Sequence, residues 1–463
     1  MGMDVHALLD KVPLAEAVWL LWNEAFSDKD LNNFYESLRG RCYERLFSFS
    51  EIVHLVSDAL CQHDGRGAQT LNRQDSTEQL PGSAQAFYGK LRRMPITLSE
   101  AFLSEGVNRL RPFLPKRLLV EAPASLRDFY ILVFDGKTFK HAAKRLKPVR
   151  AHAGKGLGGR ALVALEMTTG LLVGMAADPD AHVNEALLVP KLLPAVRKHI
   201  SGPRLWVADR QFGDLAQVRR CTEDGDHCAL RLHKKSRFTP DPEQTVHSGV
   251  DHLGRKWVDE IGTLSSTRQG SMRMRRITLF RDGQPFLEIV TSLVDADSYP
   301  ANDLLALYKN RWGIEQVFQQ VSDVFHLTHL IGSTPNAIIF QGAFCMTLYN
   351  LLLVVRAIVA DTQDRQVSSI STFNLCYDLN RELVVLHHLF SPDRIVKSLR
   401  RRAASISDLR AYLYDSLRRA WTDRWIKSKP KKRHLPPPKH KRGEAGHFSI
   451  HRVLLESKEP EDV

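Results

Sequence analysis

Residues 126–136 read LRDFYILVFDG, a short apolar run that ends on an acid and a glycine. Both faces of a central strand in an α/β sheet are buried, so such a strand is almost continuously apolar until the chain turns. The pattern returns in residues 204–213, RLWVADRQFG, where the apolar run again ends on an aspartate. The two segments predict buried strands that bring Asp135 and Asp209 to the same edge of one sheet.

Two further strands and a helix are expected between these segments. Residues 161–169 and 171–179 are apolar runs separated by a Thr-Gly turn signal, which predicts a hairpin. Residues 184–200, NEALLVPKLLPAVRKHI, predict a helix in which Asn184 is the N-cap.

The chain beyond residue 213 continues in the same alternating manner. Residues 214–221 predict a helix, residues 228 to about 297 a series of strands, and residues 302–325 one long helix. Three strands followed by alternating helix and strand is the order of an RNase H-like sheet. The expected fold class is therefore α/β, with an RNase H-like core that carries a β-rich insertion at about residues 228–297.

The segments on either side of this core have a different character. Residues 1–125 have apolar side chains at helical spacing and predict a helical N-terminal domain, while residues 361–463 predict helices followed by a basic tail. No acidic residue occurs from Arg424 to Arg442, so the tail suits an arm that lies along phosphates. A solvated tail that keeps the protein soluble is the alternative. The core itself is assigned to residues 126–360.

Charge and hydropathy narrow the class of partner. The formal net charge of +13 favours a polyanion, most commonly nucleic acid, with an anionic membrane surface as the alternative. Residues 337–360 are long and apolar enough to span a membrane, but Gln341 and Asn350 favour a buried helix. We therefore expect a soluble, cytoplasmic protein with no membrane partner. The six cysteines lack zinc-site spacing and predict reduced thiols.

Three acids have the chemistry for a metal-dependent reaction on DNA. Hard divalent cations prefer carboxylate ligands, and the sequence offers Asp135, Asp209 and Glu315, the last on the predicted long helix. Each acid also has a structural interpretation. An aspartate after a strand often forms a turn or caps the next helix, and Glu315 has Arg311 at helical spacing for an ion pair.

The segment around Glu315 resembles the signature of insertion-sequence DDE transposases, specifically the insertion-sequence-four family. That signature is Tyr, two residues, Arg, three residues, Glu, six residues, Lys, and it is met by Tyr308, Arg311 and Glu315. The Lys position falls on Ser322, where the sequence departs from the family, and Lys309 and His326 are the nearby cations. The segments FDGKTF and ADRQFG are similar to the two aspartate motifs of the family.

The resemblance implies a set of roles for residues in the core. Asp135, Asp209 and Glu315 would be catalytic and would bind two Mg²⁺ ions, for which Mn²⁺ would substitute. Tyr308 and Arg311 would hold backbone phosphates. The remaining candidate DNA contacts are Lys137, Arg210 and Trp257. Lys137 has the alternative of an ordinary surface lysine, and Trp257, a candidate for stacking on a flipped base, has the alternative of a core residue.

By the same resemblance, the reaction is cleavage at transposon ends followed by strand transfer into target DNA. The partners would be double-stranded DNA, both terminal inverted repeats and target, and a second copy of the chain in a homodimer on the DNA. A helix-turn-helix is expected in the first 120 residues. Two alternatives stay open: an RNase H-like nuclease without strand transfer, and a non-catalytic DNA-binding protein derived from a transposase.

Overall fold

A computed structural model describes most of the chain. The described residues are 8–40, 46–62, 66–76, 80–116, 120–140, 142–325, 327, 330–390, 392–428 and 446–457. Most of the basic segment after residue 424 therefore lies outside the described residues, and so does His326.

The central layer is one ten-stranded sheet, and its first half is the core that the sequence predicts. Neighbouring strands in this half are antiparallel from β4 to β1 and parallel from β1 to β6. This mixed order is compatible with an RNase H-like transposase core. The strands are, in spatial order, β4 (Leu172–Asp178), β3 (Arg160–Glu166), β1 (Tyr130–Thr138), β5 (Arg204–Ala208) and β6 (His227–Arg231).

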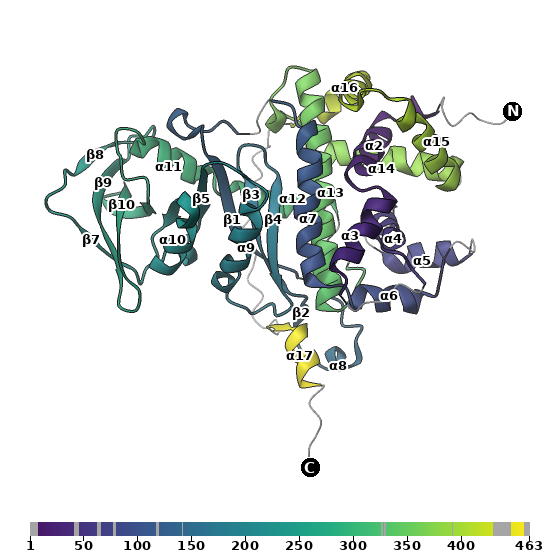
Figure 1. Cartoon of the computed structure of the whole chain (residues 1–463), viewed down its shortest axis with the longest axis horizontal. Helices are drawn as coiled ribbons and strands as arrows, with labels where there is room; N and C mark the ends of the chain where they lie inside the picture. Colours follow the sequence, from purple (N-terminus) through teal and green to yellow (C-terminus); the bar gives the residue numbers. More distant parts are fainter. Residues whose placement is uncertain are drawn as a thin grey trace, which may run out of the picture.

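The β-rich stretch continues the same sheet beyond β6, and Figure 1 shows it as a long projection on the side of the sheet away from α7 and α13. A tight turn at Asp282 and Gly283, both with positive φ, joins β10 to β11 as the Asp-Gly pair predicts. The strands are β11 (Gln284–Thr291), β10 (Gly270–Arg281), β9 (Lys256–Ser266) and β7 (Arg237–Pro240), with β8 (His247–Val250) also paired to β9.

Helices surround the core half of the sheet. Those before it are α2 (Pro13–Ala25), α3 (Asp28–Leu38), α4 (Phe49–Gln62), α5 (Gly67–Ser76), α6 (Ala84–Arg92) and α7 (Ile96–Leu110). Those that follow β1 are α8 (Lys147–Arg150), α9 (Val189–Arg197), α10 (Leu215–Cys221), α11 (Ala301–Asn310), α12 (Gly313–Val324), α13 (Pro335–Thr362), α14 (Thr372–Leu389), α15 (Pro392–Ser405), α16 (Leu409–Arg419) and α17 (Ile450–Glu456).

The apolar helix α13 is a core helix, as its buried polar residues predict. It contacts α7, which packs on β4, and in Figure 1 both helices lie between the sheet and the group formed by α2 to α6 and α14 to α16. It is the one helix among the described residues that is long and apolar enough to cross a membrane, and its most apolar window is completely buried in the protein. The Asn350 side chain pairs with both backbone polar groups of Leu172, at 2.9 and 2.8 Å. These bonds satisfy a buried amide that hydrocarbon would leave unpaired.

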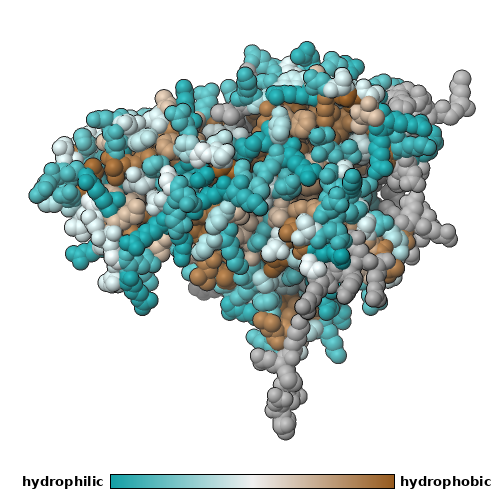
Figure 2. Space-filling view, viewed as in Figure 1, coloured by the Kyte–Doolittle hydropathy of each residue, from teal (hydrophilic) through white to brown (hydrophobic). Residues whose placement is uncertain are grey.

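The surface seen in Figure 2 is mostly hydrophilic, and its hydrophobic side chains form separate patches.

Ion pairs connect helices from opposite ends of the chain. Arg402 of α15 lies against the buried carboxylate of Glu16 in α2, and Tyr412 of α16 donates to the same carboxylate. The N-terminal and C-terminal helices are therefore packed against each other.

The helix predicted over residues 302–325 is wrong as a single helix. The chain keeps right-handed helical φ and ψ at Arg311 and Trp312, but its backbone bonds tighten there from i→i−4 to i→i−3. For example, the Arg311 amide donates to the Tyr308 carbonyl at 3.1 Å. Such a tightened turn separates the helix into α11 and α12. Tyr308 and Glu315 consequently belong to two helices rather than to one straight face.

The first turn of the helix predicted over residues 184–200 also differs. Asn184 caps as expected, because its side chain accepts the Ala186 amide at 3.1 Å. The segment that it caps, however, is a short 3-10 turn, η3 (Glu185–Leu187), and α9 begins only at Val189. Pro190 occupies the start of α9, where a missing N–H costs nothing.

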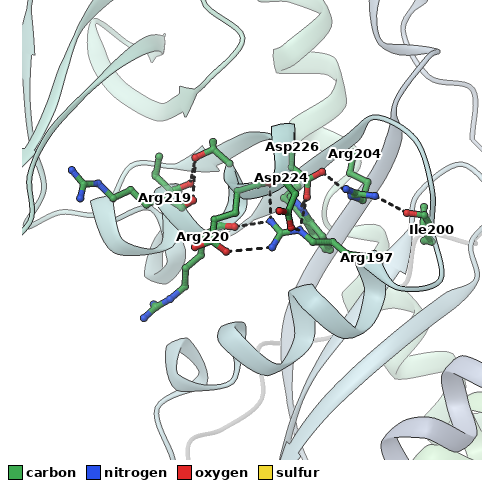
Figure 3. A network of polar contacts seen from close by, with 11 residues as sticks. Arg197, Ile200, Arg204, Arg219, Arg220, Asp224 and Asp226 are labelled. Carbon is green, nitrogen blue, oxygen red and sulfur yellow. Dashed lines mark hydrogen bonds and ion pairs between the residues drawn. The ribbon is translucent and has the colours of Figure 1, made fainter.

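A buried network fixes the first residues of β5. The Asp226 carboxylate accepts from Arg197 of α9 at 2.8 Å, from Arg204 at 2.7 Å and from the Trp206 indole at 2.8 Å. In Figure 3, Arg197 and Arg204 both point at Asp226, whereas the ends of Arg219 and Arg220 point away. Since all three donors compensate one buried charge, this end of β5 is anchored to α9 and to the segment before β6.

The described C-terminal residues return to the core. Strand β12 (His447–Ser449) pairs in parallel with β2 (Lys155–Leu157), and α17 then contacts α8. Arg452 holds the Asp180 carboxylate at 2.7 Å. Residues 446–457 are therefore not part of an extended tail; the expectation of an arm along phosphates falls on residues outside the described ones.

Candidate active site

The pairing of β1 with β5 brings the chain segments that carry Asp135 and Asp209 to neighbouring positions in the sheet. The last parallel pair in the register is Val133 with Val207; Asp135 lies two residues further along β1, and Asp209 lies one residue after the end of β5. Side chains two residues apart point to the same face, and neighbouring strands are about 4.8 Å apart. Asp135 lies inside β1 rather than at its end, because β1 runs on to pair with β3.

Glu315 approaches from the helix layer. It lies in the first turn of α12, where its carboxylate accepts from the Trp312 indole at 2.7 Å and from Arg311 Nη2 at 3.3 Å. The other terminal nitrogen of Arg311 is 4.0 Å from Asp135 Oδ2. The structural interpretation of Glu315 as the partner of Arg311 is thus met, and the same guanidinium joins Glu315 to Asp135.

The Asp135 carboxyl has an unusual proton affinity. Burial raises its pKa to about 6, and the negative charges of Glu185 and Glu315 act in the same direction. The backbone N–H of Gly136, at 2.8 Å, and the charge of Arg311 oppose this rise. The shift mainly reflects the burial of this carboxyl, to which the two neighbouring acids add, and a perturbed carboxyl of this kind is a candidate functional group.

Asp209 does not act as a helix cap. It stands at the N-cap position of the 3-10 turn η4 (Arg210–Phe212), but its side chain makes no capping bond. Its Oδ1 atom is buried and accepts no hydrogen bond within the described part of the chain. The side chain of Asp209 is therefore not a cap, although its backbone carbonyl closes the turn by accepting the Phe212 amide at 3.0 Å.

Arg231 is a neighbour of Asp209 that the sequence did not single out. The register pairs Ala208 with Leu230, so the next residues of β5 and β6 stand side by side, and Arg231 Nη1 is 3.8 Å from Asp209 Oδ1. The signal was an arginine at the end of the next apolar run, CALRLH. It becomes informative only when β6 is known to be parallel to β5.

Tyr308 is largely buried, and its hydroxyl donates to the Ala208 carbonyl at 3.3 Å. Burial raises the pKa of this phenol. The bond attaches α11 to the residue just before Asp209. In this structure the phenol oxygen of Tyr308 is therefore directed at the end of β5.

Lys137 reaches from β1 to the helix layer. Its Nζ atom donates to Ser322 Oγ at 2.9 Å and to the Phe318 carbonyl at 3.3 Å, and burial lowers its pKa. Lys137 shares the face of β1 that carries Asp135, because they are two residues apart. Ser322 stands where the signature has a lysine, and the ammonium group of Lys137 from β1 contacts it.

The two other candidate DNA contacts, Arg210 and Trp257, differ in how far they lie from β5. Arg210 directly follows Asp209, and its Nε atom is buried without a hydrogen-bond partner among the described residues. Trp257 lies on β9, separated from β5 by β6, β11 and β10, and its half-buried ring packs against Gly249. Arg210 is therefore next to Asp209 in the chain, whereas three strands of the sheet separate Trp257 from β5.

Glu185 is a fourth acid near the site that the sequence did not single out. It follows the Asn184 cap in η3, and its side chain is only 16% exposed. Its charge acts on Asp135, and its carboxylate accepts from Gln211 of η4. A glutamate one residue past an N-cap usually serves the helix terminus, so the sequence gave no reason to connect it to β1.

The donor set is chemically suited to a hard divalent cation. Three carboxylates project from β1, β5 and α12, and one oxygen of Asp209 accepts no hydrogen bond within the described part of the chain. Among the described residues, no group of three or more Asp, Glu, His or Cys side chains lies close enough to hold a metal ion. Arg311 and Arg231 instead lie against these carboxylates. The donors fit in type, and arginines now balance their charge.

Comparison with known proteins shows which domain this core resembles. Residues 127–351 match the family model described as transposase DDE domain. A comparison with curated proteins found no match. The matched segment contains all of β1 to α12, and so Asp135, Asp209 and Glu315. Residues 127–351 are therefore similar to the DDE domain of transposases, which supports a nucleic-acid-processing enzyme, a DDE transposase.

Proposed function

We propose that this protein is a DNA transposase of the insertion-sequence-four type, which cleaves the ends of a mobile element and joins them to target DNA. The observation that supports the proposal is the register of β1 and β5, whose last pair, Val133 with Val207, lies two residues before Asp135 and Asp209. Arg311 connects Glu315 to this pair. The match of residues 127–351 to the transposase DDE domain supports the same reaction class.

In this proposal, Asp135, Asp209 and Glu315 are the catalytic metal ligands. Two Mg²⁺ ions, for which Mn²⁺ substitutes, supply when bound the positive charge that activates the attacking oxygen and stabilises the leaving oxygen. Both cleavage and joining are in-line displacements at phosphorus, so one set of carboxylates serves both.

The cations and the phenol around the carboxylates are proposed to hold DNA. The guanidinium of Arg311 suits two oxygens of one phosphate. Arg210, which follows Asp209 in the chain, and Lys137, which contacts Ser322, are proposed to add positive charge. Tyr308 contacts a phosphate only by exchanging its bond to the Ala208 carbonyl. Trp257 is proposed to stack on an unpaired base farther along the DNA.

The partners follow from the reaction. Two element ends are joined together, so we propose a homodimer on double-stranded DNA that carries the terminal inverted repeats. The formal net charge of +13 supports a DNA partner. A cytoplasmic, nucleoid-associated location and DNA recognition by the N-terminal helices belong to the same proposal.

The test uses a labelled duplex carrying the end of the element, a supercoiled target plasmid and Mg²⁺ or Mn²⁺. Wild type is expected to nick the duplex at the element end and to join the label to the plasmid. Glu315→Ala is expected to bind the duplex with wild-type affinity and to leave it uncut. This separation of binding from cutting assigns Glu315 to the chemistry.

The same experiment distinguishes the alternatives. Cut ends that never appear in the plasmid identify an RNase H-like nuclease. Binding without a cut in either metal identifies a DNA-binding protein derived from a transposase, and contradicts the catalytic part of the proposal.

A further inference from the structure

The carboxylate of Glu185 contacts three segments around the candidate catalytic aspartates: η4 after β5, strand β3 and strand β1. On the β5 side, Gln211 donates its side-chain N–H to Glu185 Oε2, two residues after Asp209. On the β3 side, Arg160 Nη1 is 3.5 Å from Glu185 Oε1. Both carboxylate oxygens therefore have partners, and both partners belong to the walls of the site.

On β1, the carboxylate of Glu185 lies directly over Gly136. A Cβ atom at Gly136 would come within 2.1 Å of the Glu185 carboxyl carbon, so only a glycine permits this contact. Side chains of adjacent strand residues point to opposite faces. Glu185 therefore meets β1 from the face opposite to the one where Asp135 and Lys137 meet α12.

The loop that carries Glu185 is fixed from several directions. Arg160 donates to the Val183 carbonyl at 2.8 Å and to Thr138 Oγ1 at 3.2 Å, so one guanidinium ties this loop to the end of β1. The Asn184 cap adds a further local bond. Because these bonds fix the loop, the Glu185 side chain can hold β1 and η4 in defined positions.

We propose that Glu185 is a positioning residue, which sets the separation of Asp135 and Asp209 by packing on Gly136 and binding Gln211 behind the sheet. The inference rests on the proposed function for the meaning of that separation. Glu185 is proposed to act through its contacts with Gln211, Arg160 and Gly136, on the face of β1 opposite to Asp135, and not as a metal ligand.

The test compares Glu185→Ala with Glu185→Gln. The glutamine keeps the size of the side chain and an oxygen that accepts from Gln211, whereas alanine removes both. We expect Glu185→Ala to weaken Mn²⁺ binding and to lower kcat by about tenfold or more, with little change in the KM for DNA. Glu185→Gln is expected to stay within about threefold of wild type in both measurements, as a charge-neutral rescue.

Gly136→Ala supplies an independent approach to the same contact. The added Cβ displaces the Glu185 carboxylate, so this variant should resemble Glu185→Ala. The double variant should lose little more Mn²⁺ affinity and kcat than either single variant, because alanine at 185 removes the group that the added Cβ meets. Additive losses in the double variant would contradict the proposal.

Asp226→Asn is the matched control for a general loss of stability. It weakens the network at the other end of β5, so it should lower Tm while Mn²⁺ binding and kcat stay at wild-type values. Mn²⁺ binding is read as the rise in Tm on adding the metal, which requires no DNA cleavage.

The outcomes separate this inference from the proposed function. If Glu185→Gln is as defective as Glu185→Ala, the charge of the carboxylate is essential and the positioning role is wrong. If Glu185→Ala binds Mn²⁺ like wild type, the inference is also wrong. A wild-type protein that binds Mn²⁺ but never cuts DNA defeats the proposed function alone, and the Tm series still decides the role of Glu185.

Discussion

Lys137 and Ser322 form the contact in which this chain differs most clearly from the family signature. The ammonium group of Lys137 lies 2.9 Å from Ser322 Oγ, so a lysine at 322 would bring its charge to the same place from the other side. Lys137→Met should therefore weaken DNA binding and reduce the slope of log K against log salt by about one charge. Ser322→Lys in the Lys137→Met background should restore both quantities, measured by fluorescence anisotropy at several salt concentrations.

Ser322→Lys alone is the control, because it places two ammonium groups together and should not improve binding beyond wild type. A double variant that binds no better than Lys137→Met would show that charge at this position does not contact DNA.

At the scale of single residues, the sequence predicted positions that depend on local pattern and missed those that depend on register. Asp135 and Asp209 stand out because each follows an apolar run, and each lies two residues beyond the last pair of the β1–β5 register; their catalytic role stays a prediction. Arg231 and Glu185 carry no such local pattern. The first reaches Asp209 through the pairing of β6 with β5, and the second reaches Gly136 across the sheet.

Among the elements, the pair α11 and α12 shows how a local feature changes the geometry of a site. The pattern of residues 302–325 fits one helix, and periodicity alone does not reveal a tightened turn at Arg311 and Trp312. Gly313 is the visible signal, since glycine weakens a helix interior. The change directs Tyr308 toward β5 while Arg311 and Glu315 remain paired.

The junction of α2 with α14 predicts a pH dependence of stability. The Glu382 carboxylate of α14 accepts the Ala15 amide at 2.9 Å, at the N-terminus of α2, and burial raises its pKa to about 7 from 4.5. The folded protein thus binds this proton more tightly than the unfolded chain. The contribution of this protonated carboxyl to the free energy of unfolding is fully present below pH 4.5 and is lost as the pH rises through about 7. The total loss is roughly 3 kcal/mol.

Glu382→Gln isolates this effect, because an amide oxygen still accepts from Ala15 but does not titrate. Between pH 5 and pH 8, the free energy of unfolding in urea should fall more steeply for wild type than for the variant. Parallel curves for the two proteins would mean that Glu382 has its ordinary pKa in the folded state.

At the scale of the whole molecule, a buried ion pair joins the two ends of the chain. Glu16 in α2 is 1% exposed and lies 2.5 Å from Arg402 in α15. Arg402→Met leaves this carboxylate buried without its cation and should cost about 3 kcal/mol of unfolding free energy. The double variant Glu16→Leu with Arg402→Met should recover most of the loss, since a well-packed apolar pair often equals a buried ion pair. Equal losses in the single and double variants would contradict this account.

The order of the first three strands and the alternation after them follow from sequence, since hydrophobic runs and turn signals are local. The meeting of the N-terminal and C-terminal helices does not, because Glu16 and Arg402 look like solvated charges until both are seen to be buried against each other. The return of residues 446–457 to pair with β2 is likewise invisible in a segment that reads as the end of a basic tail.

The central claim is that Asp135, Asp209 and Glu315 form one metal centre on the transposase core. The most direct measurement is an anomalous difference map from crystals of the wild-type protein with Mn²⁺, beside crystals of Asp209→Asn. The account predicts Mn²⁺ peaks at the carboxylates of Asp135 and Asp209, with Glu315 at one of them, and weakened peaks in the variant. Full Mn²⁺ occupancy elsewhere, with none at Asp135 and Asp209, would contradict it.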